Sequence, residues 1–288
     1  MKYIKSFKLF ENSNLKIEDI IKHGTKYELN DEGKYIVYGD VDISNFNITE
    51  LPFSFKMVKG NFECNHGKFT TLKGFPEIIY GGLNLENNDL ENLDYFPKKI
   101  RGSYINLSNN KLTNIIGMKD CYIETPSLVT INLKYNFINS LEGLPEDLYT
   151  LDISDNDIKD FKHLPYTLSS LYASGLHSLE SIDGFRTDLN EFSTVYIFDS
   201  NIYDISIFKY IKNVGEYQQK CPAFYLYKLI NLESDLIDIF IGYNIIRKDG
   251  DKYIIREKNL INFTEDFNIE YDKESDLFKT IQKYYTIK

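Results

Sequence analysis

The middle of the chain repeats one short pattern. Its clearest copies are LNLENNDLENL (83–93), INLSNNKLTNI (105–115), INLKYNFINSL (131–141) and LDISDNDIKDF (151–161). Each copy has apolar residues at positions 1, 3, 8 and 11 and an asparagine at position 6, which is Asn88, Asn110, Asn136 or Asn156. Self-similarity at a period of about 21 residues is typical of a protein built by stacking similar coils.

Weaker copies extend this array in both directions. VDISNFNITEL (41–51) and FECNHGKFTTL (62–72) lack the asparagine, a degenerate copy begins at Leu171, and VYIFDSNIYDI (195–205) has Ser200 instead. Position 8 falls at residues 48, 69, 90, 112, 138, 158, 179 and 202, with one insertion around 118–125. The pattern therefore predicts about eight repeats within a solenoid over residues 41–214.

The two halves of each copy predict two different surfaces. Apolar positions 1 and 3 alternate with polar positions 2 and 4, which indicates a short strand, and stacking puts like residues over like in a parallel sheet. An asparagine amide both donates and accepts, so position 6 is expected to form a buried, structural ladder that satisfies turn backbone groups. Apolar-proline pairs in the second half favour an extended return rather than a helix; they occur at 75–76, 96–97, 144–145 and 164–165.

The resulting fold class is α/β: a right-handed solenoid with the parallel sheet on its concave face and an extended, irregular convex side. We expect an N-terminal cap over 15–40, in which Ser13 or Asn14 caps a short helix over 15–23, Gly24 ends it, and 27–38 form an irregular strand. An α+β C-terminal cap is expected over 215–288, with a helix near 226–244 and a tight turn at 247–253. A separate functional domain is the alternative for that segment.

The copies resemble leucine-rich repeats of the short, proline-containing kind found in secreted bacterial effectors. The chain also resembles leucine-rich-repeat proteins encoded by large tailed phages, through YELNDEGKYIVYGDVDIS (27–44), LPFSFKMVKGNFEC (51–64), LKGFPEIIYGGLNL (72–85) and the closing segment 236–263. The resemblance implies the solenoid architecture and a phage origin, and it carries no settled activity.

The first residues, MKYIKSFKLFE, form a basic amphipathic segment within an expected leader or tail over 1–14. They resemble the capsid-targeting leaders of T-even-type phages, and Leu9, Phe10 and Glu11 match the tripeptide after which such leaders are cleaved. The resemblance implies an internal virion protein. A loosely docked tail and a membrane-binding or partner-binding helix are the alternatives.

Composition narrows the function classes. The 288 residues are 42% apolar with a formal net charge of −10, which opposes general nucleic-acid binding. No apolar run is long enough for a membrane span. Three scattered cysteines and the absence of a secretory pattern predict a protein that is not secreted, in the cytoplasm of an infected host cell or in a virion head.

Motifs for catalysis and for metal binding are weak. Cys64 occupies an inward position while His66 is expected to face outward, so we predict no metal site there. The acidic residues around Asp155 lack the glycine of a calcium loop. Effector ubiquitin ligases carry a long helical domain with a catalytic cysteine, whereas here Cys221 lies at the start of a short segment. We expect no enzyme activity and no cofactor.

Binding is expected on the concave face, where positions 2, 4 and 5 point outward. This surface is small, polar and acidic in the first four copies and aromatic in the later ones. The predicted contact patch consists of Tyr135, Asp155, Tyr172, Tyr196, Phe198 and Asp199. The alternative is that 23 tyrosines and 20 phenylalanines place aromatics there by composition alone.

Three functions follow as hypotheses. The first is a non-catalytic module that binds a host or virion protein through its concave face. The second is an internal or structural virion protein delivered by its leader. The third, and weakest, is an enzyme with its activity in the C-terminal segment.

Overall fold

The computed structural model describes residues 15–124, 129–146, 148–179, 183–185 and 194–197. It also describes short pieces of the C-terminal region, namely 246–249, 252–255, 257–258, 261, 273, 279 and 286–287. All structural statements below concern these residues. Phe198, Asp199, Leu9, Phe10 and Glu11 lie outside them.

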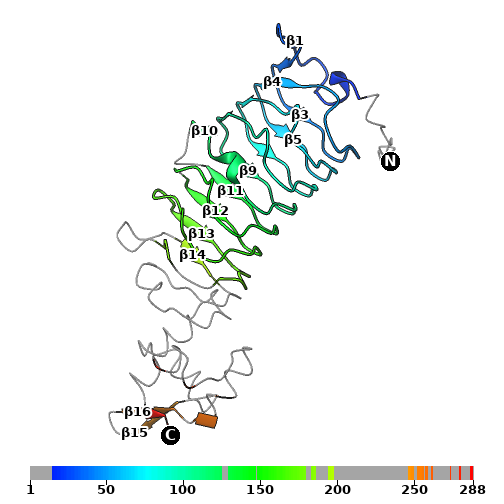
Figure 1. The fold of residues 1–288 in the computed structure, drawn as a ribbon. Helices are drawn as coiled ribbons and strands as arrows, with labels where there is room; N and C mark the ends of the chain where they lie inside the picture. Colours follow the sequence, from blue (N-terminus) through cyan, green and yellow to red (C-terminus); the bar gives the residue numbers. More distant parts are fainter. Residues whose placement is uncertain are drawn as a thin grey trace, which may run out of the picture.

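A parallel sheet of eight strands, one from each coil, follows the stack of coils (Figure 1). We call it the long sheet. In spatial order its strands are β3 (Val41–Asp42), β5 (Phe62–Glu63), β7 (Leu83–Asn84), β9 (Tyr104–Asn106), β11 (Thr130–Asn132), β12 (Thr150–Asp152), β13 (Ser170–Tyr172) and β14 (Thr194–Tyr196). Position 1 of each coil lies opposite position 1 of the next throughout the sheet.

The core repeats with the same register. At position 3, the backbone N–H groups of Leu85, Leu107, Leu133 and Ile153 each donate to a carbonyl of the following coil at 2.8 Å. All four side chains are fully buried. Like residues therefore lie over like, which confirms the parallel solenoid that the repeat predicts.

The return segments of the early coils form a second sheet, which we call the short sheet. Its strands are β1 (Tyr27–Leu29), β2 (Tyr35–Val37), β4 (Phe55–Val58), β6 (Ile78–Ile79), β8 (Lys99–Ile100) and β10 (Tyr122–Ile123). β1 pairs antiparallel with β2, and the other pairs are parallel. For these coils the return is extended, as we expected, but it is a paired sheet, so the expected irregular structure is wrong. One buried apolar residue of each return segment pairs with the equivalent residue of the next, in the order Val37, Val58, Ile79 and Ile100. This stacking brings the backbones of neighbouring return segments within hydrogen-bonding distance.

The N-terminal segment of the described chain lies against the first coil. Ile20 accepts a hydrogen bond from the backbone N–H of Asp42 at 2.8 Å, and Ile21 forms an antiparallel bridge with Val41. This pairing requires extended backbone, because β3 would otherwise leave its outer edge unpaired. The helix expected over 15–23 is accordingly wrong, and only the 3₁₀ turn η1 (Ile17–Asp19) forms there. The segment 27–38 is a hairpin of β1 and β2 rather than one irregular strand.

The described core changes character along the stack. In the first coils Phe53, Phe55, Phe62, Phe75 and Phe69 pack edge to face in one continuous chain, with ring centroids 5.2 to 5.6 Å apart. In the central coils the equivalent space is filled by leucine and isoleucine together with the asparagine ladder. The insertion contributes the 3₁₀ turn η2 (Ile116–Met118) and β10.

Near the C-terminus, β15 (Ile246–Asp249) and β16 (Lys252–Ile255) pair antiparallel, in agreement with a tight turn between them. β17 (Thr286–Ile287) pairs parallel with β16. Within the described residues, a search for helices of sufficient length and apolarity to cross a membrane finds none.

Candidate interaction surface

Position 2 of most coils holds a residue that builds the turn after the strand. The side-chain oxygens of Asp42, Asn84, Asn106, Asn132 and Asp152 each accept the backbone N–H of position 4, at 2.9 to 3.1 Å. This is the Asx-turn geometry that Asn and Asp favour. The polar, acidic character of the first half of the face is thus largely a consequence of turn formation.

Position 5 lies in the left-handed region in every described coil that contains it. Its φ values run from 54° to 67° at Asn45, His66, Asn87, Asn109, Tyr135, Asp155 and Gly175. Asparagine, aspartate and glycine tolerate this conformation, whereas a tyrosine adopts it at a cost of roughly 1 kcal/mol. Asn, Asp or Gly at position 5 of five of these seven coils is the sequence feature that indicates this conformation.

Position 6 carries the buried ladder. The amide nitrogen of Asn110 donates to the carbonyls of Leu107 in its own coil and Leu85 in the coil before, at 3.1 and 2.9 Å. Its amide oxygen accepts the N–H of Leu90 at 3.2 Å. Asn88, Asn136 and Asn156 repeat the arrangement between their own coils. Each amide therefore joins two coils through backbone groups that the turn leaves unpaired.

Position 4 differs from what the alternation predicts. Ser108, Ser154 and Ser174 are buried rather than outward, because the turn folds position 4 back beneath position 5. Ser154 accepts a hydrogen bond through Oγ from the N–H of Ser174 at 3.2 Å. The outer face of the coils of Ser154 and Ser174 is therefore made by positions 2 and 5, whereas in the coil before them Lys134, at position 4, is half-buried and contributes to the face.

Three tyrosines on this face depart from the residue types that the coil favours, and we call them the tyrosine patch: Tyr135, Tyr172 and Tyr196. Tyr172 and Tyr196 stand at position 2, where five other coils hold a turn-forming Asn or Asp. Their rings stack with centroids 4.9 Å apart and planes 17° apart. Tyr135 occupies the left-handed position and is 50% exposed.

A lysine and an aspartate join this patch. The Lys134 Nζ lies 4.5 Å from the centroid of the Tyr135 ring and 3.6 Å from a carboxylate oxygen of Asp155. Burial alone lowers the pKa of Lys134, but the hydrogen bond to Tyr135 and the charges of Asp155 and Asp152 outweigh burial, so the pKa is raised. The structure thus brings Tyr135 and Asp155 together through Lys134, which the sequence analysis did not include.

The first half of the face contains a tyrosine with a structural role that sequence reasoning missed. Tyr104 precedes position 1 in its coil, and its ring covers Gly82 of the preceding coil, where a Cβ would lie 2.0 Å from the ring. Its hydroxyl donates to Glu63, one coil further back. Burial, followed by that hydrogen bond, raises the pKa of Tyr104. The sequence feature that could have indicated this contact is a glycine at the position of Tyr104 in the preceding coil.

The short sheet carries a ladder of aromatic and basic side chains on its outer side. Lys59 Nζ lies 4.2 Å from the Tyr38 ring centroid, and Arg101 Cζ lies 4.2 Å from that of Tyr80. These four residues recur at 21-residue intervals, a regularity that the sequence analysis did not use. Arg101 also pairs with Glu124.

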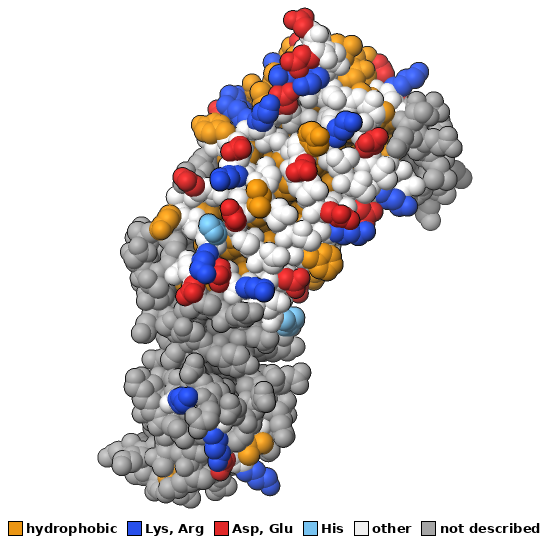
Figure 2. All heavy atoms as spheres, in the orientation of Figure 1, with side chains coloured by type: hydrophobic (Ala, Val, Ile, Leu, Met, Phe, Trp, Pro, Cys, Tyr) orange, Lys and Arg blue, Asp and Glu red, His pale blue; other side chains and the backbone are white. Residues whose placement is uncertain are grey.

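A carboxylate on the same sheet collects three lysines. Glu77 accepts from Lys34, Lys56 and Lys98 at 2.7, 3.1 and 3.2 Å. The hydrogen bond from Lys34 is the main cause that lowers the pKa of Glu77 to about 2. Figure 2 shows charges of both signs interspersed over the described part of the visible face, with no single-sign field.

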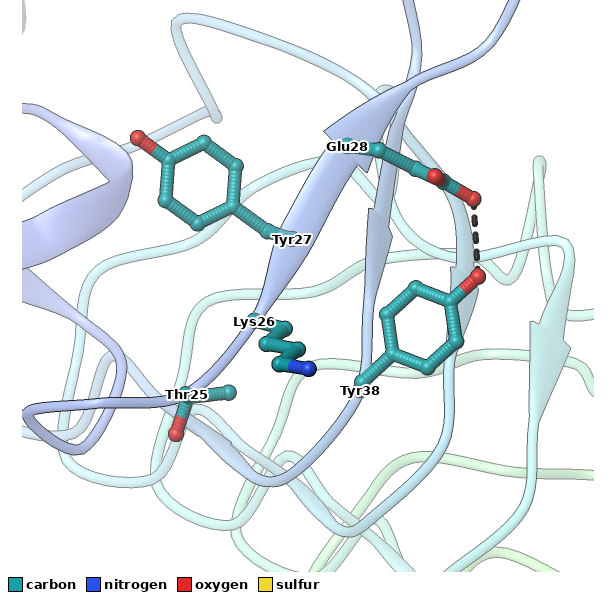
Figure 3. Close-up of a pocket in the computed structure, with 5 residues that line it drawn as sticks. All are labelled: Thr25, Lys26, Tyr27, Glu28 and Tyr38. Atoms are coloured by element: carbon teal, nitrogen blue, oxygen red, sulfur yellow. Dashed lines mark hydrogen bonds between the residues drawn. The ribbon is translucent and has the colours of Figure 1, made fainter.

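An open hollow of about 540 Å³ lies beside β1 and is lined by Thr25, Lys26, Tyr27, Glu28 and Tyr38 (Figure 3). The Tyr38 hydroxyl donates to Glu28 at 2.8 Å across one side of it. Tyr27 points away from that pair and hydrogen-bonds Glu18. The hydroxyls of Tyr27 and Tyr38 and the carboxylate of Glu28 are thus already engaged in hydrogen bonds.

The cysteine and histidine considered for a metal site lie apart. Cys64 is fully buried at position 3, where burial raises the pKa of its thiol, and His66 is exposed at position 5. Burial likewise raises the pKa of Cys121 to about 12. Among the described residues, no group of three or more His, Cys, Asp or Glu side chains is placed to hold a metal ion.

Comparison with known proteins gives one structural likeness. No family model matches the chain, and no curated protein matches it. Among solved structures it is similar to the leucine-rich-repeat domain of a Shigella effector, with 19% identity, 56% of this chain and 69% of that chain covered, and a TM-score of 0.44. The description of the fold as a leucine-rich-repeat-like solenoid rests on the strand register and the stacked core.

Proposed function

We propose that this chain is a non-catalytic protein-interaction module, which binds a protein through the outer face of the long sheet around the tyrosine patch. One observation carries the proposal. At position 2 the coil favours Asn or Asp, which closes its turn, yet Tyr172 and Tyr196 stand there, stacked and accessible to solvent. Folding of the coil does not require these two rings.

Tyr135 supports the same conclusion from a different position. Its backbone is in the left-handed region, where Asn, Asp or Gly would relieve strain. A bulky residue held in such a conformation is a reason to look for function, because the coil would be more stable without it. All three members of the patch are thus retained against the local preference of the fold.

The chemistry of the patch suits a protein partner. A tyrosine buries a large area on binding at a small loss of side-chain entropy, and its hydroxyl tolerates both water and a polar contact. Lys134, Asp152 and Asp155 surround the rings with charge, as the polar rim of an interface does. Residues Phe198 and Asp199 belong to the proposed patch from their sequence positions.

The finer parts of the proposal come from sequence alone. We propose a right-handed solenoid encoded by a phage, with terminal caps over 15–40 and 215–288 and a host or virion protein as partner. Processing after Leu9, Phe10 and Glu11 and packaging in a virion head belong to the alternative role. Mass spectrometry of purified particles tests that role, because a packaged and processed chain would begin at Asn12.

The central experiment is site-specific photocrosslinking in the full-length protein. A photoreactive phenylalanine at position 172 should form a discrete adduct with one protein in lysate of cells that express the chain, and the same group at Tyr95 should not. Tyr95 is a suitable control because it is 68% exposed and lies away from the long sheet.

Variants then test whether the patch determines binding. Tyr172→Asn combined with Tyr196→Asn should abolish capture of the crosslinked protein, while Tyr95→Asn should leave capture intact. Neither variant should melt at a markedly lower temperature than the wild type, since asparagine suits position 2 and relieves the left-handed backbone of Tyr95. Unchanged capture by the double variant would show that the proposed surface is wrong.

A further inference from the structure

The outer face of the long sheet has a step between β13 and β12. Tyr172 lies between Tyr196 on one neighbouring strand and Asp152 on the other, all in register. The centroid distance of 4.9 Å between the stacked rings matches the spacing of adjacent strands, which is about 4.8 Å. One face of the Tyr172 ring therefore covers Tyr196, and its other face is turned toward the coil of Asp152.

Asp152 forms the low side of this step. An aspartate side chain is much shorter than a tyrosine side chain, so the Tyr172 ring extends further from the sheet than Asp152 does. The carboxylate therefore lies beside the base of the exposed ring face. Oδ1 of Asp152 accepts the N–H of Ser154 at 2.9 Å, which fixes the orientation of the carboxylate. The charge of Asp152 acts on the neighbouring Lys134, but the ion pair of that lysine is with Asp155.

A tyrosine ring, a guanidinium and a carboxylate already meet on the short sheet of the same chain. On the short sheet, the Arg101 guanidinium lies over the Tyr80 ring at 4.2 Å and pairs with Glu124. Tyrosine, cation and carboxylate come there from successive return segments, with β6 next to β8 and β8 next to β10. On the long sheet Tyr172 and Asp152 lie on directly adjacent strands, so a cation that stacks on the exposed face of the ring would lie over the carboxylate.

We propose that Tyr172 and Asp152 form a recognition site for a guanidinium group, supplied by an arginine in an exposed segment of the partner. The inference rests on the proposed function, since it names the chemistry that the tyrosine patch recognises. A planar guanidinium stacks on the ring and reaches the carboxylate with its edge N–H groups, whereas a compact, strongly hydrated ammonium does one or the other. The net charge of −10 favours approach of a basic segment.

The test is an NMR titration of the full-length protein with N-acetyl-L-arginine amide and, in parallel, N-acetyl-L-lysine amide. The arginine compound should shift the resonances of Tyr172 and Asp152 with millimolar affinity, and the lysine compound should bind at least about fivefold more weakly. Equal affinity for the two amides, or shifts confined to other residues, would overturn the proposal.

Matched variants assign the two parts of the site. Asp152→Asn removes the charge but keeps the turn, because Asn84, Asn106 and Asn132 occupy the same position in other coils. Asp152→Asn and Tyr172→Asn should each weaken arginine binding at least about fivefold. Asp42→Asn, the same change in the first coil, should have no effect. Wild-type affinity in the Asp152→Asn variant would exclude the carboxylate from recognition.

The two proposals fail in different ways. If the double tyrosine variant loses its protein partner but the arginine amide shows no binding, the interaction surface stands and the guanidinium site is wrong. If the amide binds through Tyr172 and Asp152 but partner capture is indifferent to Tyr172 and Tyr196, the guanidinium site stands and the proposed function is wrong.

Discussion

On the short sheet, Tyr38 and Tyr80 each lie beneath a cation from the following coil, whereas on the long sheet Tyr172 packs against a second tyrosine. Both sheets space their side chains by the same coil repeat. The difference is that the described cations of the short sheet are already bound by its own rings and carboxylates. The tyrosine rings of the short sheet are therefore covered by cations of the chain itself, whereas Tyr172 on the long sheet keeps one ring face for an external group.

The comparison depends on one rigid register that both sheets share, and the asparagine ladder maintains that register. Asn110→Ala should lower the free energy of unfolding by about 3 kcal/mol, because it removes hydrogen bonds to two coils and leaves the buried backbone N–H of Leu90 without its acceptor. Urea unfolding measures this loss.

The matched control for the ladder is Asn139→Ala, which changes an exposed asparagine of the neighbouring coil and should alter stability by less than about 0.5 kcal/mol. Equal effects of the two substitutions would show that position 6 contributes nothing beyond an ordinary surface amide.

Tyr104 provides a contrast to Tyr172 and Tyr196 on the long sheet, because its ring packs within the fold and stabilises it. Gly82→Ala should cost about 2 kcal/mol, since the new Cβ would overlap the Tyr104 ring at 2.0 Å and displace its bond to Glu63. Adding Tyr104→Ser should recover most of that loss, which thermal unfolding of both variants would show. A Gly82→Ala protein as stable as the wild type would place Tyr104 with the accessible tyrosines instead.

The repeat alone was enough to predict the long sheet, because equivalence at about 21 residues fixes which residues lie side by side. It also identified Tyr172 and Tyr196 as neighbours in one column. Features that depend on contacts between particular pairs of coils could not be predicted from the repeat. Examples are the ring of Tyr104 over Gly82 and the pairing of the short sheet. The helix at 15–23 failed for a related reason: local propensity there is overridden by pairing of Ile20 and Ile21 with the first coil.

The ion-pair cluster of the short sheet offers a test that depends on pH. The pKa of Glu77 is lowered from 4.5 to about 2, so its stabilising contribution is complete above pH 4.5 and is lost as the pH falls toward 2. Glu77→Gln should therefore reduce stability by about 1 kcal/mol at pH 7, a value held down by the solvent exposure of the lysines.

The gap between wild type and Glu77→Gln should narrow steadily from pH 5 to pH 2 in urea titrations at each pH. Glu142→Gln, a change of an exposed glutamate, provides the control and should track the wild type at every pH. A gap that stays constant with pH would mean that Glu77 stabilises the sheet by packing and not by charge.

The smallest expected effect concerns Tyr135, and its sign is opposite to the others. Tyr135→Asn should raise the free energy of unfolding by about 0.5 kcal/mol, because asparagine tolerates the left-handed backbone at φ 56° that tyrosine adopts under strain. The gain is held below the full cost of that strain because Lys134 loses the ring beneath it. Tyr149→Asn, at an exposed residue outside the left-handed region, is the control and should bring no gain. A destabilised Tyr135→Asn protein would show that this ring, like that of Tyr104, serves the fold, and the tyrosine patch would then reduce to Tyr172 and Tyr196.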